Sequence, residues 1–259
     1  RFKMKDGHYQ TWADYCDPNI EGWASEADES LRLVRIAREN ADEVVLFNFQ
    51  CHPDCVNGNE FSADFPGMLC TRVEQAKPGT KCIYLNGAQG QMVTNDWWHG
   101  TTSRLPYEKA VEAADKLVAH ALSVFDCVEP VPYAKMAWAQ KSVTCKTKRD
   151  SSRIPEARRL LALHKEGRDA EIGPDWLATP LIAEASKLVV MEEAGLDEVS
   201  LVVSAVSFGG LAFAGIAGEP FCELGKEIRD RSPFPVTLFC SIVNGFGDYF
   251  PTAEAFDQD

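Results

Sequence analysis

The segment Val44–Phe49 most limits what this chain can fold into, because it is too apolar and too rich in β-branched residues for anything but a buried strand. The surrounding stretch Ser30–Gln50 predicts a hairpin that turns at Glu39–Asp42, although its first half also fits a helix. A second apolar stretch, Val199–Ile216, predicts two buried strands that meet at Gly209-Gly210. The core is therefore expected to be a β-sheet.

Helices are predicted between these strands. Pro106 opens one over Tyr107–Val124, and Pro155 opens a basic one that runs to His164 and stops at Gly167. For a third, over Pro180–Ala194, Thr179 is the expected cap, Pro180 the first helical residue and Gly195 the left-handed stop. The remaining predicted elements are a short helix beginning near Gly67, a strand over Lys81–Leu85, an extended stretch over Glu129–Lys148, a helix from Pro220 to Arg231 and a last strand over Val236–Val243.

Strands interleaved with helices favour an α/β protein with a mixed β-sheet core flanked by helices. No composition break marks a boundary, so residues 1–259 are expected to form a single domain.

Composition narrows the function classes. A net charge of −13 repels phosphate backbones at long range, so no nucleic-acid partner is expected. No uninterrupted apolar run is long enough for a transmembrane segment. Nine scattered cysteines suggest reduced thiols and a cytoplasmic setting. The chain opens at Arg1 without a signal-peptide pattern, which predicts the edge of a fragment.

His52 is the first candidate for chemistry, because it follows the apolar strand at a point where its side chain can reach a cleft. The ordinary alternative is a histidine hydrogen-bonded to loop carbonyls. Cys51 and Cys55 flank it, but adjacent strand residues point to opposite faces, and no second Cys/His pair follows at finger-like spacing. A Cys/His zinc finger is therefore disfavoured.

Three further segments combine polar groups with tight turns. Glu219 lies where a buried strand passes into a helix, and it can complement the helix dipole, bind a metal or act as a general base. Tyr249 follows two glycines and is either structural or functional. The turn Asn86–Asn95 can offer backbone N–H groups to an anionic intermediate, but it lacks the Gly-Lys-Ser/Thr ending of a phosphate loop.

The order of these blocks is more specific than any one of them. The succession resembles the neutral/alkaline non-lysosomal ceramidase family over nearly the whole chain, and the opening Met4-Lys5-Asp6-Gly7 is similar to its bacterial members. The blocks are His52-Pro53, Phe61 to Gly67, Asn86-Gly87-Ala88-Gln89-Gly90, Gly218-Glu219-Pro220-Phe221, and Asn244-Gly245 to Thr252.

This resemblance implies a zinc-dependent amidohydrolase that cleaves an N-acyl amide or lipid amide. Zn²⁺ would be held by two histidines, a glutamate and a tyrosine, with His52 as the second histidine and the first upstream of Arg1. Glu219 and Tyr249 would complete the ligand set. Asp64 and Thr94 are expected beside Tyr249 in the catalytic set, and the expected substrate-binding residues are Asn86, Gln89, Gly90 and Asn244.

Two departures from the family pattern affect the substrate. Val93 stands where ceramide-hydrolysing members have a serine, with Thr94 one residue further on, and no C-terminal immunoglobulin-like domain is expected in this chain. They favour a smaller or more polar N-acyl substrate than ceramide. The alternatives are a catalytically impaired binding or regulatory protein and a metal-independent hydrolase that uses Cys51 or Cys55 with a histidine. The oligomeric state stays open.

Overall fold

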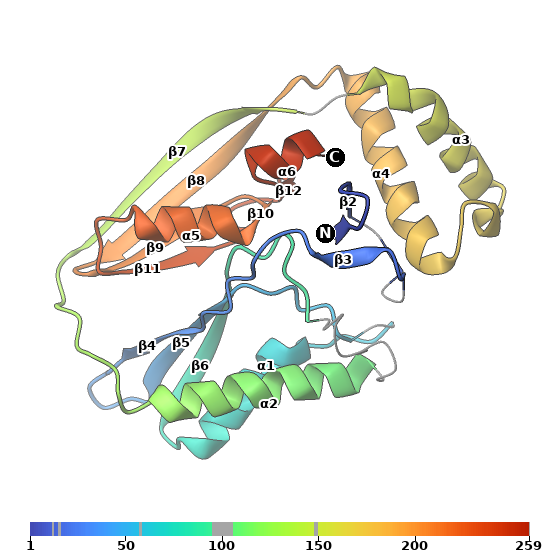
Figure 1. Ribbon diagram of the computed structural model, residues 1–259. Helices are drawn as coiled ribbons and strands as arrows, with labels where there is room; N and C mark the ends of the chain where they lie inside the picture. Colours follow the sequence, from blue (N-terminus) through green and yellow to red (C-terminus); the bar gives the residue numbers. More distant parts are fainter. Residues whose placement is uncertain (12, 15–16, 57–58, 95–105, 148–149, 259) are drawn as a thin grey trace. The chain divides into compact units, whose positions relative to one another are not determined.

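The computed structural model describes residues 1–11, 13–14, 17–56, 59–94, 106–147 and 150–258. The chain groups into two compact units, one made of residues 1–141 with 202–259 and the other of residues 142–201. The α/β class and the mixed sheets flanked by helices are confirmed (Figure 1).

The first sheet of the larger unit contains the predicted hairpin. Strand β4 (Arg32–Ile36) runs antiparallel to β5 (Glu43–Phe49), and β5 runs parallel to β6 (Thr80–Asn86). Val45 and Phe47 of β5 belong to one apolar cluster, while Leu46 belongs to another. Both faces of β5 are therefore buried, which explains its unbroken apolar sequence.

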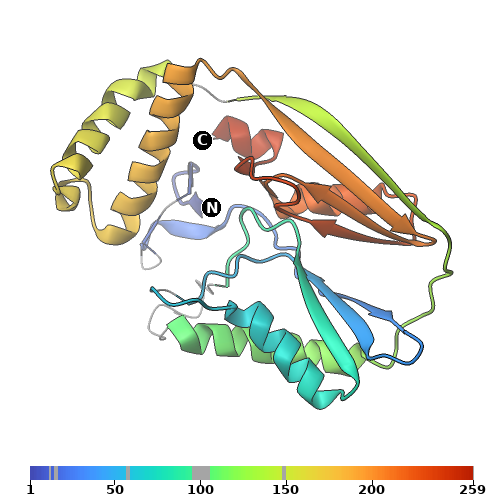
Figure 2. The ribbon, with the colours of Figure 1, turned by 180° about the vertical axis from the view of Figure 1, so that it is seen from behind.

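Helices α1 (Asp64–Ala76) and α2 (Pro106–Val124) lie side by side on one face of this sheet in both views (Figures 1 and 2). Helix α2 begins at the predicted proline. Helix α1 begins three residues before the predicted Gly67, because Asp64 and the fully buried Phe65 already belong to its first turn. The predicted strand Lys81–Leu85 is confirmed as the centre of β6.

A second sheet has the order β11-β9-β8-β7. Gly209-Gly210 joins β8 and β9 as predicted, and β11 ends earlier than predicted because Ile242 and Asn244 adopt positive φ angles of 57° and 61°. Leu211 and Leu238 pack with Leu46 of the first sheet. The strands are β7 (Met136–Lys146), β8 (Glu198–Phe208), β9 (Leu211–Ile216) and β11 (Val236–Cys240), and α5 (Cys222–Asp230) packs against β11.

Several short elements of this unit were not predicted. Some are held by partners distant in sequence, such as β10 by β12, and others surround a cluster of Phe2, Met4, Ala13 and Ile20. They are β1 (Phe2–Met4), β2 (Tyr9–Gln10), β3 (Ile20–Trp23), β10 (Glu219–Pro220), β12 (Tyr249–Phe250) and α6 (Ala253–Gln258).

In the smaller unit, α3 (Ile154–Lys165) packs against α4 (Asp175–Ala194) through Leu160, Leu188 and their neighbours. Gly195 ends α4 with a φ of 61°, as predicted. The predicted start of α4 was wrong, because the helix begins five residues earlier and Pro180 lies inside it. The additional first turn buries Ala178, and this burial favours helix there. It outweighs the helical hydrogen bond that is lost because proline has no backbone N–H. Within the described residues, no helix is long and apolar enough to cross a membrane.

Candidate functional site

His52 lies two residues beyond the buried Gln50 at the end of β5, and its side chain is largely buried. Its backbone N–H donates to the carbonyl oxygen of Met92 at 2.9 Å. Its Nε2 atom lies 3.4 Å from Oε2 of Glu219. Cys51, the preceding residue, instead belongs to the core cluster under α1 and α2. The two neighbours therefore have different surroundings, as predicted for the end of a strand.

Glu219 and Tyr249 are brought together by the short parallel pair β10–β12, in which they are direct register partners. The backbone N–H of Glu219 donates to the carbonyl oxygen of Asp248 at 2.9 Å. The Tyr249 ring centroid lies 5.9 Å from that of His52. The three residues expected to bind zinc therefore converge from three separate segments.

Tyr249 is a protonated phenol at neutral pH. Burial raises its pKa to about 12, and the charges of Glu219 and Asp248 contribute to the rise. A hydrogen bond with Glu219 acts in the same direction, which means that the neutral phenol donates to the carboxylate.

Gln89 was expected to contact substrate, but the structure gives it an internal partner. It is 3% exposed, and its Nε2 donates to Oε2 of Glu219 at 3.0 Å. Glu219 itself is 6% exposed, and its side-chain contacts with Gln89, His52 and Tyr249 include no permanent positive charge. A buried carboxylate in such surroundings is stabilised by a cation.

Gly90 and Gln91, which follow Gln89, also form hydrogen bonds with the segment around Glu219. The backbone N–H of Gly90 donates to the carbonyl oxygen of Pro220 at 2.9 Å, and a Cβ at position 90 would lie 2.5 Å from the carbonyl oxygen of Glu219. The side-chain oxygen of Gln91 accepts from the backbone N–H of Cys222 at 2.8 Å. Gly90 is thus required for close backbone approach, a role distinct from the expected substrate contact.

Asp64 was expected in the catalytic set, and its carboxylate is engaged by backbone amides. Its Oδ2 accepts from Val56 N at 2.7 Å, and its Oδ1 accepts from Phe65 N at 2.6 Å. It is 6% exposed and has a positive φ of 50°. These contacts join the loop after His52 to the start of α1, so Asp64 shapes that loop.

Asn86, Thr94 and Asn244 also have protein partners. The side-chain amide of Asn86 lies 3.1 Å from the carbonyl oxygen of Phe49 and 3.0 Å from that of Cys51. The Thr94 hydroxyl lies 3.1 Å from the Cys55 thiol, and Asn244 Nδ2 donates to the Ser204 hydroxyl at 3.0 Å. Asn86 therefore supports the segment that leads to His52. Asn95, the end of the predicted turn, lies outside the described residues.

Asp54 is a further carboxylate of this region that sequence reasoning missed. Burial raises its pKa, while the charge of His52 opposes the rise and that of Asp64 adds to it. Its position two residues after His52 was the available signal, but the charged residues of a loop are usually solvated.

The donor set of His52, Glu219 and Tyr249 fits a zinc ion. An imidazole nitrogen and a carboxylate oxygen are common zinc ligands, and a catalytic zinc keeps an open position beside its protein ligands. Among the described residues, no group of three or more His, Cys, Asp and Glu side chains forms a metal cluster. The candidate site needs the phenol of Tyr249 as its third donor.

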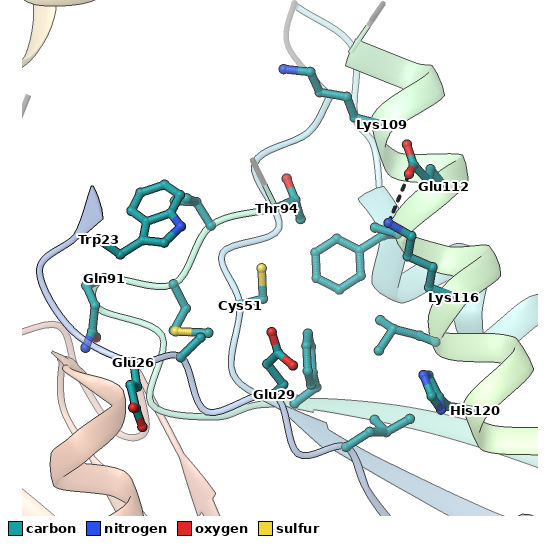
Figure 3. Close-up of a pocket in the computed structure, with 18 of the residues that line it drawn as sticks. Trp23, Glu26, Glu29, Cys51, Gln91, Thr94, Lys109, Glu112, Lys116 and His120 are labelled. Atoms are coloured by element: carbon teal, nitrogen blue, oxygen red, sulfur yellow. Dashed lines mark ion pairs between the residues drawn. The ribbon is translucent and has the colours of Figure 1, made fainter. Parts of the chain in front are cut away.

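Figure 3 shows an open cleft of about 1170 Å³ that Cys51, the residue before His52, helps to line. Two residues next to His52 form part of the cleft wall. They are Cys51, which precedes His52 in the chain, and Met92, whose carbonyl oxygen accepts the backbone N–H of His52. Val93 and Thr94 also line it. Helix α2 forms another wall, with Lys109, Lys116 and His120.

Comparison with solved structures shows a ceramidase-like fold. The neutral ceramidase from Pseudomonas aeruginosa matches with a TM-score of 0.53 at 14% identity, over 80% of this chain and 38% of that chain. A structure described as ceramidase complexed with C2 matches with a TM-score of 0.55 at 13% identity, over 82% of this chain and 40% of that one. The chain thus spans about two-fifths of the length of these neighbours. No family model and no curated protein sequence matches the chain.

Proposed function

We propose that this chain is the zinc-binding part of a ceramidase-like amidohydrolase that cleaves an N-acyl amide bond. The observation that carries the proposal is the convergence of His52, Glu219 and Tyr249. The fold shared with neutral ceramidases supports it. So does the buried Glu219 carboxylate, whose side-chain contacts with Gln89, His52 and Tyr249 include no Lys or Arg.

In this proposal His52 Nε2, the Glu219 carboxylate and the Tyr249 oxygen would hold the ion. Zinc, when bound, supplies a Lewis acid that polarises an amide carbonyl and lowers the pKa of a bound water. The chain itself keeps the donors in place. Gln89 orients the carboxylate, and the Met92 carbonyl fixes the backbone of His52.

The substrate proposed for this site is an N-acyl amide other than long-chain ceramide. Val93 presents only an apolar side chain to the cleft, and the neighbouring Thr94 hydroxyl lies within hydrogen-bonding distance of Cys55. Val93 therefore supplies no hydroxyl, and the Thr94 hydroxyl is shared with the Cys55 thiol. The same observation favours a second candidate function, a zinc-containing binding protein without turnover.

Zinc content and hydrolysis together test these proposals. We expect the full-length protein, with the histidine expected upstream of Arg1, to retain close to one equivalent of zinc, and His52→Ala and Glu219→Ala to lose most of it, whereas His164→Ala on α3 should keep it. Zinc content unchanged in both ligand variants would refute the ligand assignment. Hydrolysis across a panel of N-acyl amides that includes ceramide then separates the functions. Ceramide as the best substrate would refute the substrate proposal, and zinc without hydrolysis would favour the binding protein.

A further inference from the structure

An asparagine followed directly by glycine occurs at Asn57, Asn86 and Asn244. Such pairs are prone to spontaneous deamidation, because glycine has no side chain to hinder its nitrogen from reaching the preceding side chain. The pair at Asn57 lies outside the described residues. The other two pairs have opposite surroundings in the fold.

The pair Asn86-Gly87 is held at the end of β6. Gly87 is buried, and its backbone N–H donates to the carbonyl oxygen of Phe49 at 2.9 Å. The Asn86 side-chain amide lies 3.1 Å and 3.0 Å from the carbonyl oxygens of Phe49 and Cys51. Both reacting groups are engaged, so this pair reacts only after local opening of the structure.

The pair Asn244-Gly245 is exposed in the loop between β11 and β12. Within the described part of the chain, the Asn244 side chain makes a single hydrogen bond, from Nδ2 to the Ser204 hydroxyl at 3.0 Å. Among the same residues, the backbone N–H of Gly245 donates to no acceptor. Both reacting groups of this pair are therefore accessible in the folded chain.

Deamidation begins when the Gly245 nitrogen attacks Cγ of Asn244. A C–N bond forms, the bond from Cγ to Nδ2 breaks, and ammonia leaves with the proton of the Gly245 N–H, which closes a succinimide ring. Water then opens the ring. Cleavage of the new bond at Cγ gives aspartate, whereas cleavage at the main-chain carbonyl carbon gives isoaspartate, whose backbone is one carbon longer.

The loop 242–248 has little room for a longer backbone, because both of its ends contact the same short segment. The N–H of Ile242 donates to the carbonyl oxygen of Gly218 at 3.0 Å, and the N–H of Glu219 donates to the carbonyl oxygen of Asp248 at 2.9 Å. Ile242 and Asp248 already have positive φ angles of 57° and 72°, which residues other than glycine rarely adopt. An added carbon therefore displaces one end of the loop from this segment.

We propose that Asn244 is a site of spontaneous deamidation, and that its isoaspartyl product loosens the hold of the loop on Glu219. This inference goes beyond the proposed hydrolysis, because it follows from the exposed pair and from backbone contacts. Deamidation would also limit the lifetime of the metal site, and only that consequence rests on the proposed function.

Ageing the purified chain at mildly alkaline pH, with peptide mass spectrometry at intervals, tests the first half of the proposal. We expect Asn244 to deamidate at least about tenfold faster than Asn86, because the Asn86 pair must first open. In urea that unfolds the chain, the two rates should converge. Equal rates in the folded chain, no reaction at Asn244, or the same difference in urea would overturn the proposal.

Hydrogen–deuterium exchange in EDTA tests the second half, on peptides that contain Glu219. The aged chain should exchange the Glu219 amide about tenfold faster than the fresh chain, because its hydrogen bond to Asp248 is weakened. Asn244→Asp has the charge of the product without the added carbon and should keep the protection of the fresh chain. Asn244→Gly accepts the positive φ and has no amide to lose, so ageing should leave it unchanged.

Unchanged exchange in aged protein rich in isoaspartate would overturn this second half, as would the same loss of protection in Asn244→Asp. Both measurements are made without bound metal. Failure of the zinc hydrolase proposal therefore leaves both results unaffected.

Discussion

Glu219 and Tyr249 lie directly opposite each other in the parallel pair β10–β12, although they are far apart in the sequence. The backbone of Glu219 is held by Asp248, and its side chain by Gln89. The candidate site is thus assembled by backbone pairing first, and its side chains are then oriented by internal hydrogen bonds.

Replacing Gln89 with alanine should weaken zinc binding by about 10- to 100-fold, because the Glu219 carboxylate loses the amide that orients it. Competition with a chromophoric chelator measures the zinc Kd. Gln140→Ala removes an exposed amide bonded to Ser204 and serves as the control. An unchanged Kd for Gln89→Ala would show that the hydrogen bond has no part in metal binding.

Gly90→Ala should lower the free energy of unfolding by about 1–3 kcal/mol, because the new methyl group would overlap the Glu219 carbonyl oxygen. Urea titration followed by circular dichroism measures this change. The same variant should bind zinc more weakly, since relief of the overlap moves β10. Full stability together with an unchanged zinc Kd would contradict the close approach described here.

The ion pair between Arg229 and Asp28 should contribute to stability, because their side chains are only 8% and 10% exposed. Arg229→Met should cost about 3 kcal/mol by leaving the Asp28 carboxylate without its partner. The double variant Asp28→Asn with Arg229→Met should recover part of this loss, since it removes the stranded charge. A double variant less stable than the single one would argue against this explanation.

The same pair predicts a pH dependence. Burial alone would raise the pKa of Asp28, but hydrogen bonds from Ser30 and the charges of Arg229 and Arg32 outweigh it and hold the pKa below 3.8. A lowered folded-state pKa adds stability above the unfolded value that is lost as the pH falls through the folded value. Urea titrations at neutral pH and below pH 3.8 should therefore show a smaller acid-induced loss in Asp28→Asn than in the wild type.

Cys51 and Cys55 should be unreactive in the folded chain. Both are 4% exposed, and burial raises the pKa of Cys55 to about 11 and that of Cys51 further. Iodoacetamide at neutral pH should therefore label the exposed Cys127 before Cys51 or Cys55, as read by peptide mass spectrometry. Rapid labelling of Cys51 or Cys55 with loss of hydrolysis in the presence of EDTA would instead support the cysteine hydrolase.

Local sequence signals predicted the elements that depend on residues within the element or that have a strongly apolar sequence. The hairpin of β4 and β5, the proline start of α2 and the glycine stop of α4 each follow from residues within the element. Pro180 shows the limit, since its usual preference for the first turn is overridden by the burial of Ala178. The two-residue strand β12 has no local signal, because pairing with distant Glu219 creates it.

In the candidate site, too, the sequence predicted some features, whereas others depend on contacts between distant segments. The order of blocks indicated His52, Glu219 and Tyr249, and the structure brings these three together. Sequence could not show that Gln89 and Gly90 face Glu219, because such contacts depend on how distant segments pack. Substrate binding by Asn86 and Asn244 stays a prediction, and their described partners lie at Phe49, Cys51 and Ser204.

The turn after β6 has a consequence for how such a protein can diverge. Its first half, from Gln89 to Gln91, is bonded to the segment around Glu219, while Val93 and Thr94 face the cleft. Mutations at the second pair of positions can therefore alter ligand preference without disturbing the metal donors. Under selection for a new substrate, Val93 and Thr94 can therefore change while Gln89 to Gln91 stay the same.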